Sequence, residues 1–252
     1  MRATHLEYKF RFIIHGLIYM LGFWAPWLLI PRLEEIPFFT PNSLWIVLST
    51  EIARVHLLSV FQAVDALLVI ALIFMGVAAA LRVWGSAYVG ATVVHSGSMH
   101  GDAMLADGPY RRTRNPLYLG TLLHTIGIAI LMPVSGAVFA IVLIWIFQFR
   151  LALAEEPFLA ARFGQPYLDY KAAVPRFLPS PKALVPAAGQ QPRWLQAIAG
   201  EFYFIAAFVV LAIWGWEFNA QPLKRGIFIS LGVWLVIRAL LPRKAPEQNA
   251  TT

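Results

Sequence analysis

A single uncharged stretch decides the predicted fold: PLYLGTLLHTIGIAILMPVSGAVFAIVLIWIFQF, residues 116–149. Its 34 residues contain no Asp, Glu, Lys or Arg, and they are enough apolar chain for two short membrane crossings. Pro133, Ser135 and Gly136 supply a turn near the middle. The stretch therefore predicts a helical hairpin whose two ends return to the same face of a membrane.

The composition indicates an integral membrane protein. Hydrophobic residues make up 59% of the chain and charged residues 13%, which is about half the share of a soluble domain. The mean hydropathy is +0.66. The absence of cysteine excludes disulfides, thiolate metal sites and a cysteine nucleophile. The net charge of +7 could suit nucleic acid, but the basic residues flank apolar runs and no aromatic-plus-basic RNA motif occurs.

Further apolar segments add spans to the hairpin. With the hairpin helices at about 117–132 and 137–153, they predict an all-α, polytopic transmembrane helix bundle of about six spans. Residues 43–56 carry Glu51, Arg54 and His56, and they form either a short interfacial helix or the wet end of a longer one. The remaining apolar segments are residues 12–30, 57–81, 194–216 and the marginal 227–241, with a loop expected at 31–42.

The basic residues orient this topology. Sixteen of the twenty lysines and arginines fall on one side if that side holds both chain termini and the segments 82–115 and 150–193. Basic residues accumulate on the cytoplasmic side of membrane proteins. We therefore expect a multi-pass protein with both termini and these two segments in the cytoplasm.

Two motifs flank the hairpin, DGPYRRTRNPLYLG at 107–120 and EEPFLAARFGQPYLDYKAAVPRFLP at 155–179. The first contains GPY-x3-R-N-P-x-Y-x-G, which resembles the GxY-x3-RHP-x-Y-x-G motif of the isoprenylcysteine carboxyl methyltransferase family. The second contains EE-x2-L-x3-FG-x2-Y-x2-Y-x3-VP, which is similar to the second motif of that family. Their order around a short hairpin also matches, and the resemblance covers residues 104–181.

The resemblance implies a membrane methyltransferase that uses S-adenosylmethionine, with its pocket at the cytoplasmic end of the hairpin. Arg114 and Glu156 are then the catalytic candidates, and no metal is expected. Asn115 replaces the family's usual histidine; it can position a cofactor through hydrogen bonds, but it cannot transfer a proton near neutral pH. The implied cofactor-binding residues are Tyr110, Arg114, Asn115, Pro116, Tyr118, Gly120, Glu155, Glu156, Tyr167 and Tyr170.

The chemistry of these residue types suits the cofactor. Paired carboxylates can hold its ammonium or its ribose hydroxyls, and the Arg114 guanidinium can bind its carboxylate in a fork. Tyrosine rings can face the adenine or the sulfonium. Gly120 allows a close approach of backbone or ligand.

Each feature also has a structural explanation. The two glutamates could be an interfacial acidic pair, the tyrosines an aromatic belt, and Arg111 and Arg112 topogenic charges. His124 lies on a helical face with Gly120 and Gly127, which favours close helix packing over catalysis. Within the spans, Asp65 and Gln148 are functional candidates or partners inside the bundle. The two motifs in register nevertheless favour a site.

The domain organisation follows from the motifs. Residues 1–90 form an N-terminal transmembrane region, residues 91–193 a methyltransferase core with the hairpin and a cytoplasmic cofactor segment, and residues 194–252 a C-terminal transmembrane region with a polar tail. The sequence gives no signal for an oligomeric state.

The expected reaction is methyl transfer to a lipophilic, membrane-dissolved acceptor that enters sideways from the bilayer. By family analogy the acceptor group is a carboxylate, and membrane lipids, but no nucleic acid, are the other partners. Three alternatives remain: a phospholipid amine N-methyltransferase, an NADPH-dependent membrane sterol or isoprenoid reductase, and a membrane scaffold without activity.

Overall fold

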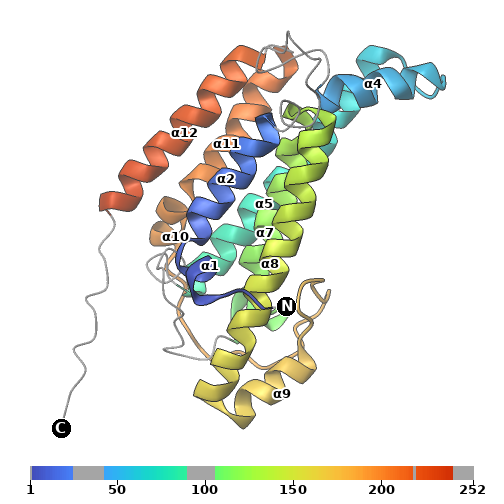
Figure 1. Ribbon diagram of the computed structural model, residues 1–252. Coiled ribbons are helices and arrows are strands. Elements are labelled where there is room, and N and C mark those ends of the chain that lie inside the picture. The colour runs from blue at the N-terminus through green and yellow to red at the C-terminus, as the bar shows by residue number, and fades with distance from the viewer. Residues whose placement is uncertain (1, 25–42, 90–105, 218–219, 241–252) are drawn as a thin grey trace.

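The structure is a computed structural model that describes residues 2–24, 43–89, 106–217 and 220–240 (Figure 1). Within these ranges, regular structure is helical apart from one isolated bridge between Ser43 and Pro133. The predicted all-α class is confirmed. The loop expected at 31–42 lies outside the described residues.

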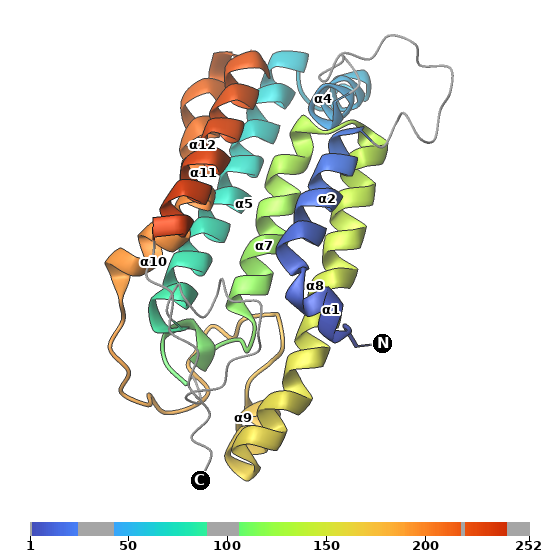
Figure 2. The ribbon, with the colours of Figure 1, turned by 60° about the vertical axis from the view of Figure 1, so that its left-hand side comes forward.

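The long helices run side by side as one bundle with two distinct ends (Figures 1 and 2). These helices are α2 (Arg11–Trp24), α5 (Val60–Val89), α7 (Pro116–Ile128), α8 (Val134–Phe163), α11 (Phe202–Trp214) and α12 (Ala220–Leu240). One end, called the motif end below, carries α1 (His5–Lys9), η1 (Gly108–Arg111), α9 (Gln165–Ala173) and α10 (Trp194–Gly200). The opposite end carries α4 (Leu44–Arg54), η2 (Ala129–Leu131) and η3 (Gly215–Glu217).

Two described helices, α5 and α8, are long and apolar enough to cross a membrane, with 30 residues each. The pair α10 and α11–η3, bent by 67°, adds a third crossing if it counts as one broken span. The helices Arg11–Trp24 and Pro116–Leu131 are apolar but shorter. The chain is therefore an integral membrane protein, while a count of about six spans stays a prediction.

The hairpin forms where the sequence places it. Its first helix, α7, continues through η2 to Met132, whose extended backbone breaks the helix. Pro133 then serves as the N-cap of α8. At the crossing of α8 with α2, a Cβ atom on Gly136 would lie 1.7 Å from the carbonyl oxygen of Gly22. Small residues let these two helix backbones approach closely.

Two helices continue past the predicted C-terminal ends of their spans. The second hairpin helix does not end near residue 153, because α8 continues through Pro157 to Phe163. Glu155 and Glu156 therefore lie within this helix rather than just beyond its end. The helix α5 continues to Val89 instead of ending at 81, and its last turns bury Ser86 and Ala87.

The ambiguous segment 43–56 forms α4, which lies across the end of the bundle rather than along it (Figures 1 and 2). Its Trp45 is buried and donates a hydrogen bond of 2.9 Å to the carbonyl oxygen of Val64 on α5. Glu51 and Arg54 are exposed and pair with each other at 2.6 Å. This arrangement agrees with the first of the two alternatives, a short helix lying flat.

Candidate functional site

The two motif segments lie against each other at the motif end. Residues 107–115, which lead into α7, are bonded along their length to residues 174–190, which follow α9. The Asp107 carboxylate accepts hydrogen bonds from the backbone amides of Ala188 and Gln190. In the other contacts, backbone or side-chain donors bind backbone carbonyl oxygens. The bonded pairs include Asp107–Ala188, Arg111–Leu184, Arg112–Ser180, Thr113–Phe177 and Asn115–Arg176.

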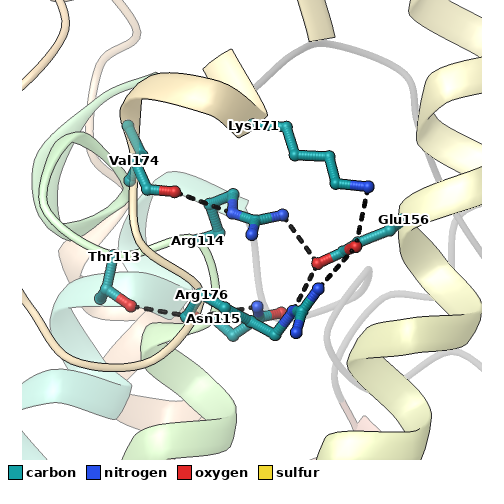
Figure 3. A network of polar contacts seen from close by, with 7 residues as sticks. All are labelled: Thr113, Arg114, Asn115, Glu156, Lys171, Val174 and Arg176. Atoms are coloured by element: carbon teal, nitrogen blue, oxygen red, sulfur yellow. Dashed lines mark hydrogen bonds and ion pairs between the residues drawn. The ribbon is translucent and has the colours of Figure 1, made fainter. Parts of the chain in front are cut away.

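Glu156 lies at the centre of this contact and faces three cationic side chains (Figure 3). Its Oε1 accepts from Arg114 Nη1 at 2.7 Å and from Arg176 Nε at 2.6 Å. Its Oε2 accepts from Arg176 Nη2 at 3.0 Å and lies 3.1 Å from Lys171 Nζ. The Glu156 side chain is only 8% exposed. Three cations around one carboxylate leave an excess of two positive charges, which suits an additional anionic group.

Arg114 is held both through its guanidinium and through its backbone amide. Its Nε donates to the carbonyl oxygen of Val174 at 2.9 Å, and its backbone amide donates to the carbonyl oxygen of Pro175 at 2.9 Å. These bonds fix the side chain where it meets Glu156. The pKa of Arg176 is raised by its hydrogen bonds to the Glu156 carboxylate, so this guanidinium remains charged.

Asn115 and Pro116 begin α7. Pro116 occupies the first helical turn, where its missing N–H leaves no hydrogen bond unmade. The Asn115 side chain does not cap the helix; its Nδ2 donates to the carbonyl oxygen of Arg176 at 3.0 Å (Figure 3). Asn115 thus ties the start of α7 to the segment that carries one of the Glu156 partners.

Glu155 binds two tyrosine hydroxyls. Tyr118 of α7 donates to its Oε1 at 2.5 Å, and Tyr8 of α1 donates to the same atom at 2.7 Å. The helix α1 is fixed beside α8 by Glu7, which accepts from Arg150 Nη2 at 2.7 and 2.8 Å. Sequence analysis missed Tyr8, because it belongs to no motif and precedes Glu155 by 147 residues.

Three other predicted tyrosines lie in the packing of the cofactor segment. Tyr167 and Tyr170 form a small buried cluster with Val174. The Tyr170 hydroxyl donates to the carbonyl oxygen of Tyr110 at 2.9 Å. Burial raises the pKa of Tyr110 and of Tyr170, so both phenols stay neutral. Contact of these rings with adenine or a sulfonium stays a prediction.

Gly120 allows a close approach, and in the structure the approaching group is a side chain of α5. A Cβ atom at Gly120 would lie 2.6 Å from Arg82 Cγ and 3.1 Å from the carbonyl oxygen of Ala78. Approach of a ligand to Gly120 stays a prediction. Sequence analysis did not select Arg82. An arginine that directly follows a long apolar run nevertheless indicates that its side chain has a polar partner inside the bundle.

The polar residues within the spans have separate environments. His124 is fully buried, with its ring 4.8 Å from that of Phe204, which agrees with a packing role. Gln148 Nε2 lies 3.1 Å from His15 Nε2. Asp65 is exposed on α5. Among the residues that the structure describes, no three His, Cys, Asp or Glu side chains gather as a metal-binding group.

The structure thus brings the strongest sequence candidates together. Arg114, Asn115 and Glu156 lie together with Lys171 and Arg176. The three cationic residues Arg114, Lys171 and Arg176 are called the cation cluster below. Tyr118 and Glu155 contact each other beside it. Both motif segments lie at one end of the bundle, as the hairpin predicted.

Comparison with known proteins agrees with the motif assignment. The profile of the phospholipid methyltransferase family matches residues 66–166. Protein-S-isoprenylcysteine O-methyltransferase of Mus musculus is 35% identical over 89 residues, covering 34% of this chain and 31% of the mouse protein. Protein-S-isoprenylcysteine O-methyltransferase A of Arabidopsis thaliana is 36% identical over 78 residues, covering 30% of this chain and 39% of the plant protein.

These matches span only about a third of the length of the curated relatives. No solved structure matches the chain significantly. The matched region contains the hairpin, the whole first motif and the start of the second. The expected resemblance is therefore confirmed: residues 66–166 match the phospholipid methyltransferase family, and part of the chain is similar to isoprenylcysteine O-methyltransferases.

Proposed function

We propose that this protein is a membrane methyltransferase that transfers a methyl group from S-adenosylmethionine to a carboxylate on a lipophilic acceptor dissolved in the bilayer. The observation that carries the proposal is the ion pair between Arg114 and Glu156. It joins the two motifs across the hairpin, inside the region that matches the methyltransferase family. The same comparisons favour methyl transfer over the reductase alternative.

The donor set of the site fits this cofactor. The excess positive charge of the cation cluster suits the carboxylate of the methionine moiety, with Arg114 and Arg176 as forked donors. Glu155 and the Tyr118 hydroxyl, on the adjacent helix faces, suit an ammonium or ribose hydroxyls. When bound, the cofactor supplies a methyl group on an electrophilic sulfonium.

The residues of the site then have a positioning task. A carboxylate is already a nucleophile at neutral pH and needs no general base, which is compatible with Asn115 where the family usually has histidine. Methyl transfer requires the acceptor and the methyl group in line, in a site from which water is excluded.

The apolar outer faces of α5 and α8 expose Ile73, Val142 and Trp145, and they suit an acceptor that arrives through the lipid. We place the site at the cytoplasmic face, where the soluble cofactor is available.

A second candidate is N-methylation of a phospholipid amine, which the description of the matching family favours. An ammonium must lose a proton before it can attack a methyl group. Glu155, at the same end of the bundle, is a carboxylate that could accept this proton. The two candidates share the cofactor site and differ only in the acceptor.

The test is turnover of methyl-labelled S-adenosylmethionine in membranes that contain the protein, with membranes containing the Arg114→Ala variant as control. The proposal expects a labelled lipophilic product whose label is released as volatile methanol by mild base, since methyl esters hydrolyse there. Label that resists base and remains on a phospholipid headgroup would establish the second candidate. Equal labelling with the wild type and the variant would contradict both.

A further inference from the structure

Arg82 and Glu201 form an ion pair in the interior of the bundle, and neither residue belongs to the cation cluster. Arg82 Nε lies 2.6 Å from Glu201 Oε2, and the two side chains are 7% and 0% exposed. Charged groups inside membrane helices are costly and mark functional positions by default. A buried pair also adds little net stability compared with apolar side chains of similar volume. The pair therefore calls for an explanation beyond stability.

Arg82 reaches the first turns of α7. Its Nη1 donates to the carbonyl oxygen of Leu117 at 3.1 Å and to the Thr121 hydroxyl at 2.7 Å. Its aliphatic part fills the space beside Gly120. Leu117 lies only three residues after Arg114. The guanidinium of Arg82 therefore binds the first turn of α7, next to the cation-cluster residue Arg114.

Glu201 comes from a part of the chain outside the family match. It lies at the break between α10 and α11, where the axis bends by 67°. Trp234 of α12 donates to the carbonyl oxygen of Gly200 at this break, at 2.6 Å. The amide of Arg193, which precedes α10, donates to the carbonyl oxygen of Ala87 on α5 at 2.8 Å. The C-terminal helices are thus fixed to α5 at the motif end.

We propose that Arg82 and Glu201 are positioning residues of the methyltransferase site. The C-terminal helices hold Glu201, Glu201 orients Arg82, and Arg82 fixes the first turns of α7 so that Arg114 meets Glu156. This inference rests on the proposed function. It assigns a role to helices α10 to α12, which the family region does not include.

The decisive variant replaces both members of the pair at once. In Arg82→Met/Glu201→Leu the buried charges give way to apolar side chains of similar volume, a change that leaves many proteins as stable as before. The pair Glu51 and Arg54, exposed at the opposite end, supplies the matched control Arg54→Met/Glu51→Leu. Thermal unfolding in detergent, equilibrium binding of S-adenosylmethionine and steady-state kinetics are measured for each protein.

Positioning predicts a double variant that unfolds near the wild-type temperature but binds the cofactor roughly 10- to 100-fold more weakly, because small displacements in a site are costly. The matched control should bind as the wild type does. If the double variant fails to fold, Thr121→Val is used in its place. Thr121→Val removes one contact of Arg82 with α7 and keeps the ion pair. It should weaken cofactor binding at an unchanged unfolding temperature.

Wild-type cofactor affinity in the folded double variant, or in Thr121→Val where that variant replaces it, would overturn the inference. A wild-type protein that does not bind S-adenosylmethionine would instead contradict the proposed function. The two failures are therefore distinguishable.

Discussion

Arg114 and Glu156 meet at 2.7 Å although 42 residues separate them in the sequence. The intervening chain is the helical hairpin of α7 and α8, which leaves the motif end and returns to it. Neither residue could reach the other if only one crossing separated them. The ion pair is thus a direct consequence of the uncharged stretch 116–149 and of its central turn.

Glu156→Gln should abolish most cofactor binding and leave the bundle folded. The variant removes the negative charge that holds Arg114, Lys171 and Arg176 together, and the three cations then repel each other. Hydrogen bonds to charged groups contribute about 1.5–3 kcal/mol, so we expect at least about a tenfold loss of affinity for S-adenosylmethionine. Circular dichroism checks the helix content, and Glu51→Gln is the control. Unchanged affinity in Glu156→Gln would remove this carboxylate from the site.

Asn115→His should be tolerated, because an imidazole N–H can replace the amide donor to the carbonyl oxygen of Arg176. We expect methyl transfer within about threefold of the wild type. Asn115→Leu has no donor, and the lost bond should cost about 1–3 kcal/mol, or about 5- to 150-fold in cofactor affinity. Labelled-cofactor turnover compares the three proteins. An inactive histidine variant would show that Asn115 serves a chemistry that differs from that of the family motif.

Gly136→Ala should destabilise the bundle, since the new Cβ would overlap the carbonyl oxygen of Gly22. Overpacking of this kind typically costs about 1–3 kcal/mol. Gly232→Ala in α12 is the matched control, because a Cβ there meets no atom within 4 Å. We expect a lower unfolding temperature in detergent for Gly136→Ala and an equal or higher one for Gly232→Ala. Equal temperatures for Gly136→Ala and the wild type would argue against the close crossing of α2 and α8.

The sidedness of the two bundle ends can be tested by single cysteines, since the chain contains none. Leu178→Cys lies at the motif end and Leu57→Cys lies next to α4, and both native side chains are more than 70% exposed. A membrane-impermeant maleimide should label Leu57→Cys in intact cells and Leu178→Cys only in inverted vesicles. Labelling of both positions from the same side would contradict the topology.

Local sequence signals were sufficient for the hairpin and for the central pair of the site. The uncharged run, the turn residues and the two motifs each act over short distances, and they predicted which residues would share one end. For residues 43–56 they left two alternatives open, a short interfacial helix and the wet end of a longer one, and the structure agrees with the first. The end of α8 was mispredicted near residue 153, whereas the helix continues through Pro157 to Phe163, since one proline removes a single backbone hydrogen bond.

The partners of the predicted residues could not be read from the sequence. Lys171 and Arg176 reach Glu156 only because the chain reverses at Gly164, where φ is +62° and glycine is favoured. Tyr8 and Glu201 contact residues that are 147 and 119 positions away, respectively. Contacts at such separations depend on how helices pack, and no spacing or periodicity in the sequence encodes them.

The central claim is that both motifs bind one molecule of S-adenosylmethionine at the motif end. It is tested most directly by ultraviolet cross-linking of labelled S-adenosylmethionine to the purified protein, followed by peptide mapping. The account predicts adducts in both 107–120 and 155–179, suppressed by unlabelled cofactor and strongly reduced in Glu156→Gln. Specific adducts confined to the opposite end of the bundle, or to only one of the two segments, would contradict it.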